Sequence, residues 1–414
     1  MFPAESDSFQ RQDPTQDPRP SCVSLIFPRE AHFKGGRLLD FLRTWELKGA
    51  PRGILQIIGG YTIPFVSKPP LVHFSVLTKI SFETKGMESE LTSLQEQGIL
   101  ETSTSTTGFL SRMFPVTKSD GSVRPIINLR GLNRYLSPKK FRLINHTKVL
   151  DFLQPRDYLL KLDISQAYFH IPVKPQHRRF LSVVHQGEIL QFTCLPFGLS
   201  TAPLTFSKVT NWLASQLRNR GARVIVYLDD FLFAGQDPSQ LEIIWHEAVH
   251  FLTELGWILN LEKSSKNPVT RLKFLGIVWD TVANLRSLPL EKITSIEKDL
   301  KIVFKHNSWN WEIAKRLLGK LNFAAFIVPL GRIHSRHLQR ASNHLSQFQR
   351  KVVVPLPPSA RKECTWWLQN LRNSSPIFAC RKTIFLSTNA SDLGWGAQLN
   401  GKHMQGLWNP KQKI

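Results

Sequence analysis

The sequence predicts a protein of the α+β class with several packed units, and three observations support this prediction. The chain has 414 residues, 42% of them hydrophobic, which is enough for roughly two to four packed units. Short apolar strands alternate with helical stretches and frequent Gly or Pro from residue 108 to residue 280. Beyond Pro289 the apolar residues recur at helical spacing, which indicates a separate helical part.

The composition predicts a nucleic-acid partner. Lys and Arg total 54 against 31 for Asp and Glu, and the net charge of +23 favours binding to a polyanion. Charge alone leaves open a merely basic soluble protein or one that binds anionic membranes. The sequence contains no apolar run of about eighteen residues and no signal-peptide pattern. We therefore expect no membrane insertion, no secretion, and a cytoplasmic or nuclear location.

The segments before residue 108 lead into the predicted core. Residues 1–30 are rich in Asp, Gln, Pro and Ser, a composition typical of a disordered tail. Residues 31–85 are expected to form an N-terminal extension that wraps the following domain. Apolar side chains recur at helical spacing over residues 87–100, and Gly98 is a usual helix terminator, so one amphipathic helix is expected there.

Two aspartates lie where a predicted hairpin reverses. The segment VIVYLDDFLFAG, residues 224–235, contains two apolar runs that meet at Asp229 and Asp230. Aspartate is also a common turn residue, because its side chain bonds nearby amides. This motif alone therefore leaves a catalytic and a turn-forming interpretation open.

A third aspartate ends another predicted strand. In YLLKLDISQAYFHI, residues 158–171, Leu160 and Leu162 face one side of the strand while Lys161 and Asp163 face the other. Carboxylates at the margin of a sheet are suited to hold two Mg²⁺ ions, which phosphoryl transfer needs at the attacking oxygen, the leaving oxygen and the triphosphate. For Asp163 alone, a solvated surface carboxylate is the competing interpretation.

Three motifs, in their order along the chain, resemble those of reverse transcriptases. The segments similar to motifs A, B and C of that family are DISQAY (163–168), LPFGLSTAPLTF (195–206) and YLDD (227–230). Similarity to the fingers strands, motif D and the primer grip is carried by KSDGSVRPIINLRGLN (118–133), LGWILNLEKS (255–264) and LKFLGIVW (272–279). The resemblance covers residues 90–345 continuously.

The resemblance implies a role for each matching residue. Asp163, Asp229 and Asp230 would be the catalytic carboxylates and, with the backbone of Ile164, would hold two Mg²⁺ ions, Mn²⁺ being an alternative. The implied nucleotide-binding residues are Lys118, Arg124, Ser165, Gln166, Ala167, Tyr168, Phe197, Gly198 and Lys263. The implied primer grip comprises Phe274, Leu275 and Gly276.

Side-chain chemistry agrees with several of these roles. Lys118 and Arg124 would grip the phosphates, although an exposed basic face is the competing interpretation. Tyr168 matches the steric-gate position, where a ring beneath the sugar leaves no room for a 2′-hydroxyl; without the motif it would be interpreted as a core aromatic. Phe197 and Gly198 would shape the floor beneath the template base and the incoming nucleotide.

On this resemblance we expect a right-hand polymerase. Residues 86–284 would form the fingers and a palm with an antiparallel sheet, 285–345 a helical thumb, and 346–382 a connection. Residues 383–414 contain FLSTNASDLGWGAQL, which resembles the first hairpin of an RNase H domain, and are expected to form a truncated RNase H-like β-meander. The family has a metal-binding Asp where this sequence has Asn389, which makes RNase H activity doubtful.

The predicted function is that of an RNA-directed DNA polymerase of a retrotransposon, which uses an RNA or DNA template-primer and deoxynucleoside triphosphates. Segments 41–65, 195–209 and 331–341 resemble DIRS-type elements, with gypsy-type elements the next choice. Other proteins of the same element are further expected partners. Two alternatives stay open: a non-catalytic nucleic-acid-binding relic, and an RNase H-type nuclease, which Asn389 and the truncation oppose.

Overall fold

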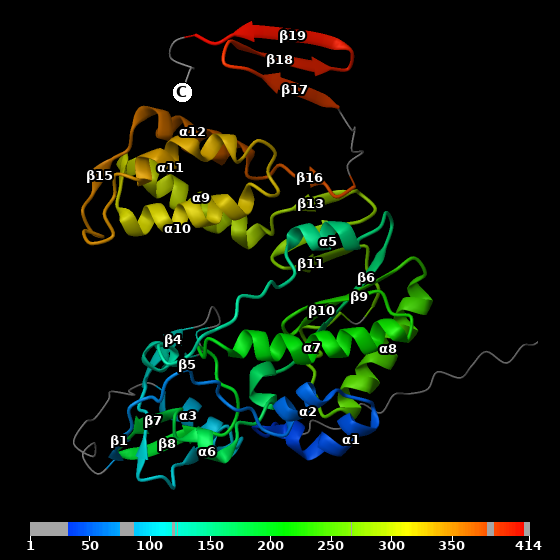
Figure 1. Cartoon of the computed structure of the whole chain (residues 1–414), viewed down its shortest axis with the longest axis vertical. Coiled ribbons are helices and arrows are strands. Elements are labelled where there is room, and N and C mark those ends of the chain that lie inside the picture. The colour runs from blue at the N-terminus through cyan, green and yellow to red at the C-terminus, as the bar shows by residue number, and fades with distance from the viewer. Residues whose placement is uncertain are drawn as a thin grey trace, which may run out of the picture.

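The structure is a computed structural model that describes residues 32–74, 87–117, 121, 123–265, 267–378 and 385–409. The predicted tail, residues 1–30, and Lys118 lie outside the described residues. Short helices and small sheets lie at one end of the molecule, a central sheet follows, and a helical bundle and a β-meander lie at the other end (Figure 1).

A three-stranded antiparallel sheet with the strand order β6–β10–β9 lies at the centre of the chain. The strands and their covering helices are β6 (Tyr158–Asp163), β9 (Val224–Tyr227), β10 (Asp230–Gly235), α7 (Ala202–Asn219) and α8 (Pro238–Glu254). Helix α7 packs on β9, and α8 packs on β6 and β10 (Figure 1). The register pairs Asp163 with Asp230, so both predicted carboxylate strands are neighbours in one sheet.

The two faces of this sheet belong to two different cores. One face contributes Leu160, Leu162, Phe231 and Phe233 to the core that includes α7 and α8. The opposite face contributes Leu159, Leu232 and Ala234 to a core shared with the C-terminal helices. By strand alternation Lys161, Asp163 and Asp230 lie on this second face, where the apolar residues stop, so the predicted alternation of Leu160 and Leu162 against Lys161 and Asp163 is confirmed.

Small sheets and short helices, among them the predicted helix α3, make up the fingers end of the molecule (Figure 1). These elements are β1 (Val72–His73), α3 (Glu88–Glu96), β2 (Leu100–Thr102), β3 (Thr107–Gly108), β4 (Arg112–Thr117), β5 (Val123–Asn128), α4 (Arg130–Asn133), η3 (Ala167–His170), α6 (Pro175–Arg178), β7 (Ser182–His185) and β8 (Glu188–Phe192). Helix α3 buries Leu91, and Gly98 follows it at φ 63°, a conformation suited to glycine. This confirms the predicted helix and its terminator.

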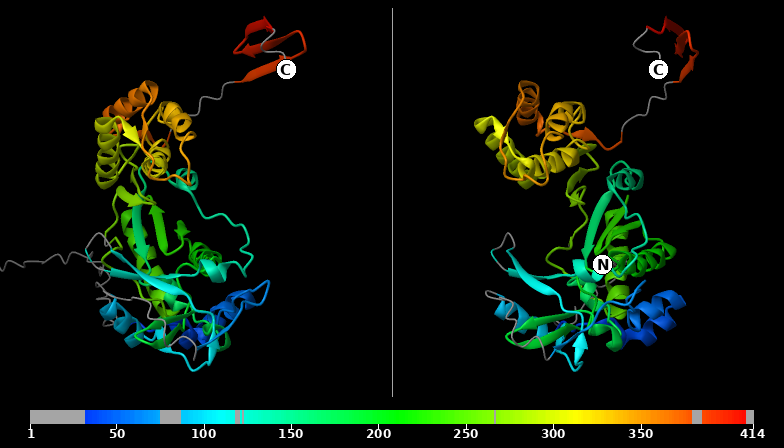
Figure 2. Two further views of the ribbon diagram at one scale, coloured as in Figure 1. Left: turned by 90° about the vertical axis from the view of Figure 1, so that its left-hand side faces the viewer. Right: turned by 60° about the vertical axis from the view of Figure 1, so that its left-hand side comes forward.

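The N-terminal extension packs against the underside of the central sheet's helices. It contains η1 (Arg37–Phe41), α1 (Leu42–Leu47) and α2 (Arg52–Ile58), which lie beside α7 and α8 (Figures 1 and 2). Trp45 is fully buried, its ring lies 5.1 Å from that of Trp212, and its indole N–H donates to the carbonyl of Leu255 at 2.9 Å. The described part of this extension therefore folds onto the palm.

A helical bundle follows Pro289, as the periodicity predicts. Its elements are α9 (Leu290–His306), α10 (Trp311–Ala324), η4 (Ile333–Ser335), α11 (Arg336–Ser342), α12 (Pro358–Asn370), β14 (Ser308–Trp309) and β15 (Val354–Pro355). Apolar side chains from α9 and α10 meet in its core, among them Ile293, Leu300 and Leu317. Helix α12 packs against α9 and α11 and buries Trp367 completely, so it completes the bundle.

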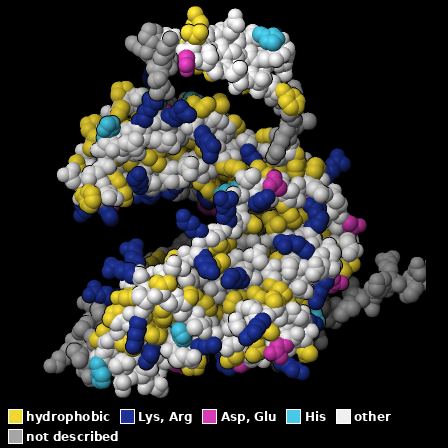
Figure 3. All heavy atoms as spheres, viewed as in Figure 1, with side chains coloured by type: hydrophobic (Ala, Val, Ile, Leu, Met, Phe, Trp, Pro, Cys, Tyr) yellow, Lys and Arg dark blue, Asp and Glu magenta, His cyan; other side chains and the backbone are white. Residues whose placement is uncertain are grey.

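A four-stranded sheet joins the bundle to the palm. Its strands, in sheet order, are β11 (Arg271–Phe274), β12 (Ile277–Asp280), β13 (Leu285–Ser287) and β16 (Ser375–Pro376), and α5 (His146–Phe152) lies beside it (Figure 1). The space-filling view shows a wide hollow between the helical bundle and the palm and fingers, with Lys and Arg side chains on both sides (Figure 3).

The C-terminal described residues form an open antiparallel meander of β17 (Leu386–Ala390), β18 (Gly394–Leu399) and β19 (Lys402–Leu407). It stands apart from the helical bundle in both views of Figure 2. Leu386, Met404 and Leu407 are more than half exposed on it.

The α+β class and the antiparallel palm sheet are confirmed by the structure.

Candidate active site

Two carboxylates and one ammonium group meet at the edge of the central sheet. The Lys161 Nζ lies 2.8 Å from Asp230 Oδ1 and 3.7 Å from Asp163 Oδ2. All three side chains come from β6 and β10 and leave the same face of the sheet, because paired residues and residues two apart share a face. Asp163 is only 8% exposed. The sheet register therefore brings together two aspartates that are 67 residues apart in the sequence.

Asp229 occupies the hairpin turn beside this pair. The preceding Leu228 has φ 55°, which is uncommon for a side chain of this kind and marks a strained tight turn. The amide of Ile164 donates to the carbonyl of Asp229 at 3.3 Å, which ties the turn to the end of β6. Asp230 is the first residue of β10, so of the two aspartates Asp229 alone lies in the turn.

The pKa values of two of the aspartates, Asp163 and Asp229, lie above the ordinary value of a carboxyl group. Burial, the largest cause, together with the neighbouring Asp230 and Asp229 raises the pKa of Asp163 to about 7, against the opposing effect of Lys161. Burial also raises the pKa of Asp229. Carboxylates whose charged forms are destabilised in this way gain most from a nearby cation.

A cavity of about 490 Å³ is lined by Asp163 and Asp229, and Asp230 is not among its lining residues. The predicted site residues that line it are Arg124, Asp163, Ile164, Ser165, Gln166, Ala167, Phe197, Asp229 and Lys263. They come from β5, the end of β6, the loop after β6, η3, the loop before α7, the hairpin turn and the loop after α8. Nine residues named from the sequence thus meet around one hollow.

Several lining residues were not identified from the sequence. They are Glu90, Ser93, Leu94, Gln97, Val123, Pro125, Phe169 and Asn260. The helical pattern of α3 predicted which of its residues face the core, but it could not predict that other residues of this helix line the cavity. The backbone amide of Asn260 donates to the backbone carbonyl of Asp163 at 2.8 Å. This bond fixes the segment that carries Lys263 against β6.

The loop between β6 and η3 is held by a buried histidine. Gln166 has φ 47°, and the amide of Ser165 donates to the carbonyl of Ile258 at 2.9 Å. The amide of Ile258 lies 3.0 Å from Nε2 of His170, which must accept, so Nδ1 carries the proton toward the carbonyl of Ala167 at 3.3 Å. Burial lowers the pKa of His170 to about 3, so this histidine is neutral.

Tyr168 is buried behind the cavity and does not line it. Its ring packs 4.7 Å from the ring of Phe197 and 4.8 Å from that of Phe206. Burial raises its pKa to about 12, with a smaller contribution from Asp229. Phe169, the next residue, does line the cavity.

Gly198 shapes the loop beneath Phe197. It has φ 93°, and a Cβ there would lie 3.2 Å from the carbonyl oxygen of Ile127, so the loop passes close to β5 at a position that favours glycine. The side-chain amide of Asn133 donates to the Gly198 carbonyl at 2.9 Å.

The predicted primer-grip residues lie outside the cavity: Phe274 ends β11, and Leu275 and Gly276 form the turn between β11 and β12. Leu275 and Gly276 have φ 50° and 72°, and a Cβ at Gly276 would collide with the ammonium of Lys292 at 2.5 Å. The imidazole Nε2 of His146 lies 3.3 Å from the carbonyl of Leu275. The turn therefore sits where α5 and the helical bundle meet.

The residues at the edge of the sheet fit the predicted divalent cations in their chemistry. Among the described residues no three His, Cys, Asp or Glu side chains are gathered closely enough to hold an ion alone. Mg²⁺ commonly takes one or two carboxylates and completes its octahedron with water and substrate phosphates, so the pair of Asp163 and Asp230 with Asp229 nearby is an adequate donor set. The Lys161 ammonium already occupies a cationic position between two of them.

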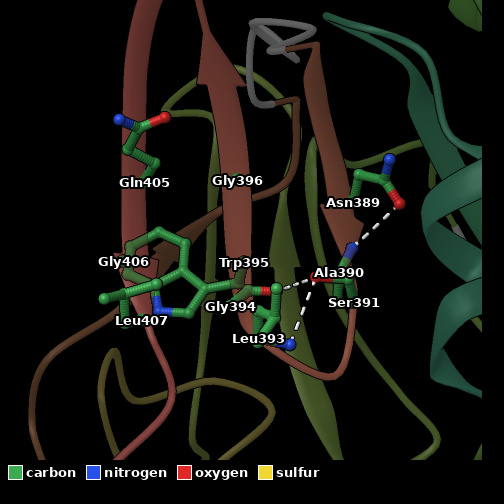
Figure 4. A pocket seen from close by; sticks show the side chains of 10 residues that line it. All are labelled: Asn389, Ala390, Ser391, Leu393, Gly394, Trp395, Gly396, Gln405, Gly406 and Leu407. Carbon is green, nitrogen blue, oxygen red and sulfur yellow. Dashed lines mark hydrogen bonds between the residues drawn. The ribbon is translucent and has the colours of Figure 1, made fainter.

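A second hollow lies on the C-terminal meander and has a different character. Its lining residues are Asn389, Ala390, Ser391, Leu393, Gly394, Trp395, Gly396, Gln405, Gly406 and Leu407, and none of them is acidic (Figure 4). The Asn389 side-chain oxygen accepts from the amide of Ala390 at 2.9 Å. Asn389 stands where the RNase H family has a metal-binding Asp, and its side-chain oxygen binds the backbone of the next residue.

A palm sheet with carboxylates at its edge, between a fingers region and a helical bundle, defines the polymerase fold. The model of the family described as reverse transcriptase (RNA-dependent DNA polymerase) matches residues 116–279. The chain therefore contains a reverse transcriptase domain.

Two solved structures share this fold. The foamy viral protease-reverse transcriptase in complex with double-stranded DNA is 18% identical, with a TM-score of 0.60 over 90% of this chain and 64% of that chain. The same kind of protein in complex with an RNA/DNA hybrid is 19% identical, with a TM-score of 0.59 over 86% of this chain and 46% of that chain. At this identity the likeness shows the fold alone.

Curated relatives match in sequence over part of their length. Protein P of duck hepatitis B virus (strain China) is 31% identical over 199 residues, 46% of this chain and 23% of that protein. The transposon Tf2-3 polyprotein of Schizosaccharomyces pombe is 23% identical over 302 residues, 71% of this chain and 21% of that protein. The chain thus spans less than a quarter of the length of these relatives. In the part of the chain that the structure describes, none of the helices could cross a membrane.

Proposed function

We propose that this chain is an RNA-directed DNA polymerase of a retroelement, which adds deoxynucleotides to a primer 3′ end and releases pyrophosphate. The observation that carries the proposal is the convergence of Asp163, Asp229 and Arg124 on one cavity, with Asp230 paired to Asp163 in the adjacent strand. Carboxylates for cations and a guanidinium for phosphates are the groups that phosphoryl transfer requires.

Each part of the chain contributes to the proposed reaction. Asp163, Asp229 and Asp230, with the carbonyl of Ile164, would hold two Mg²⁺ ions or, alternatively, Mn²⁺. Bound there, the ions would neutralise the triphosphate and activate the primer hydroxyl. Arg124 and Lys263, which both line the cavity, would bind phosphates, and Lys118 would add to this charge. The backbone from Ser165 to Ala167 would lie beneath the triphosphate.

The template-primer would occupy the hollow between the fingers and palm and the helical bundle. Lys and Arg side chains line both sides of it (Figure 3). Such a surface contacts phosphates and gives salt-dependent binding with little sequence preference. We assign the fingers and palm to residues 86–284, the thumb to 285–345 and the connection to 346–382, with Phe274, Leu275 and Gly276 as primer grip. We place the protein in the cytoplasm or nucleus, where other proteins of its element would be partners.

The element type is part of the proposal. Segments 41–65, 195–209 and 331–341 support a DIRS-type element, with a gypsy-type element next. The Tf2-3 polyprotein, a transposon product, supports the broader assignment to a retrotransposon.

Primer extension tests the proposed function. Purified protein with poly(rA), an oligo(dT) primer, dTTP and Mg²⁺ should lengthen the primer, and EDTA should stop the reaction. A folded protein that binds template-primer without extending it with either Mg²⁺ or Mn²⁺ would favour the non-catalytic relic. Cleavage of the RNA strand without extension would favour the nuclease.

A further inference from the structure

Lys161 makes a contact that the proposed reaction does not use. Its Nζ lies 2.8 Å from Asp230 Oδ1 and 3.7 Å from Asp163 Oδ2, and its side chain is 20% exposed. The ammonium thus bridges the two carboxylates that pair across β6 and β10.

The backbone of Lys161 is fixed, so only its side chain can move. Its amide donates to Ser265 Oγ at 3.1 Å, and its carbonyl accepts from the amide of Ser265 at 2.9 Å. The residue also pairs with Leu232 of β10. A lysine side chain has four flexible methylenes, so rotation can carry the ammonium away while the strand stays in place.

We propose that Lys161 is the resident counterion of this carboxylate pair: it holds Asp163 and Asp230 together when no divalent cation is bound, and it competes with the cation for them. Lys161 would therefore set the metal affinity of the site. The inference rests on the proposed function in taking these aspartates as the metal ligands.

The physical reason is charge neutralisation in a partly buried place. Two carboxylates at adjacent strand positions repel each other, and one ammonium compensates part of that charge. A divalent cation cannot share Asp230 Oδ1 with an ammonium at contact distance, because like charges repel most strongly where water is scarce. Metal binding must therefore displace Lys161, and the cost of breaking that ion pair weakens metal affinity.

An exposed ion pair offers a matched control. Lys34 Nζ lies 3.1 Å from Asp40 Oδ2 on the N-terminal extension, with side chains 66% and 52% exposed. Replacing Lys34 by Met removes the same charge and the same kind of contact, but outside the cavity and in water, where such pairs contribute little.

Mn²⁺ binding to the full chain, without nucleic acid, tests the proposal. Free Mn²⁺ is followed by electron paramagnetic resonance for the wild type and for Lys161→Met, Lys161→Arg and Lys34→Met. Lys161→Met should bind Mn²⁺ about tenfold more tightly than the wild type, as expected for loss of one competing charge at a partly buried site. Lys161→Arg and Lys34→Met should stay within about twofold of the wild type, because charge is kept in one and lost to solvent in the other.

Melting temperature gives a second readout. In EDTA, Lys161→Met should melt below the wild type, because its carboxylates lack a counterion, and Mn²⁺ should raise its melting temperature more than it raises that of the wild type. Equal or weaker Mn²⁺ affinity in folded Lys161→Met overturns the proposal. If the variant is unfolded in EDTA, recovery by Mn²⁺ supports the counterion role, while failure of both Lys161→Met and Lys161→Gln to recover overturns it.

Primer extension with the same preparations separates this inference from the proposed function. Extension by the wild type together with unchanged Mn²⁺ affinity in Lys161→Met means that only the inference fails. No extension by the wild type, with tighter Mn²⁺ binding in Lys161→Met, means that the proposed function fails and the inference stands.

Discussion

At the scale of single residues, Asp229 is placed where a change of charge should affect chemistry more than folding. It sits in the two-residue turn between β9 and β10 and lines the cavity. The turn is held by its backbone, since the carbonyl of Asp229 accepts from Ile164. Asparagine keeps the shape of the side chain and also suits turns.

We predict that Asp229→Asn retains the fold but lowers primer extension by at least about a hundredfold, because a charged cation ligand is lost. Single-turnover extension and the melting temperature check this together. Asp40→Asn, on the exposed surface, is the matched control and should extend primers normally. Near-normal extension by Asp229→Asn would contradict the assignment of the site.

Tyr168 and Phe169 separate two accounts of sugar selection. The motif places Tyr168 at the steric gate. In the structure Phe169 lines the cavity, whereas Tyr168 does not line it and packs against Phe197. We predict that Tyr168→Ala raises the use of ribonucleotides relative to deoxynucleotides by about tenfold or more, a change typical of losing one steric contact in the transition state. Single-nucleotide kinetics with rUTP and dTTP measure this ratio. An unchanged ratio in Tyr168→Ala with a raised ratio in Phe169→Ala would transfer the role to Phe169.

His170 should make the stability of the folded chain depend on pH. Its pKa is lowered to about 3 by burial, with Arg37 adding to the shift, from an ordinary value of about 6.5. The unfolded chain therefore binds a proton below about pH 6.5 that the folded chain refuses, so the stability is complete above that pH and is lost as the pH falls. By pH 5 the loss from this group should reach about 2 kcal/mol.

Urea unfolding between pH 7 and pH 5 measures this loss. His170→Gln removes the titrating group and should show a flatter dependence, while His344→Gln, at an exposed position, should follow the wild type. Parallel curves for His170→Gln and the wild type would exclude this source of pH dependence.

At the scale of elements, α1 is attached to the palm mainly by one side chain. Trp45 is fully buried between Trp212 and Trp257 and donates to the Leu255 carbonyl. We predict that Trp45→Ala lowers the free energy of unfolding by about 3–5 kcal/mol, the usual cost of removing a large buried ring. Leu47→Ala on the same helix, whose side chain is 72% exposed, should change it by less than about 0.5 kcal/mol. Urea denaturation of both variants decides, and equal effects would show that α1 is not attached through Trp45.

At the scale of the whole molecule, the C-terminal meander should not act as a nuclease. RNA cleavage of the RNase H type depends on cations held by several carboxylates, and the hollow on the meander is lined by Asn389 and other uncharged residues (Figure 4). We predict that the chain does not degrade the RNA strand of a labelled RNA:DNA hybrid with Mg²⁺ or Mn²⁺. Specific cleavage that disappears on deleting residues 383–414 would refute this prediction.

Local patterns in the sequence were sufficient for the elements that carry the site. The alternation around Asp163, the hairpin at Asp229 and the helix that stops just before Gly98 are set by side-chain period and turn chemistry, which neighbouring residues determine. The order of the motifs along the chain then predicted that Arg124 and Lys263 belong to the same site, and both line the cavity in the structure.

What only the tertiary structure decided are the contacts between distant segments. Strand pairing and helix packing decide several contacts at the site. They bring Lys161 to Asp230 and Asn260 to Asp163, they place residues of α3 at the cavity, and they pack Tyr168 against Phe197. No local period records such contacts, because they are selected by the burial of surfaces that the chain brings together only on folding. The sequence by itself determined a basic α+β chain with carboxylates at strand ends, and packing determined which groups those carboxylates face.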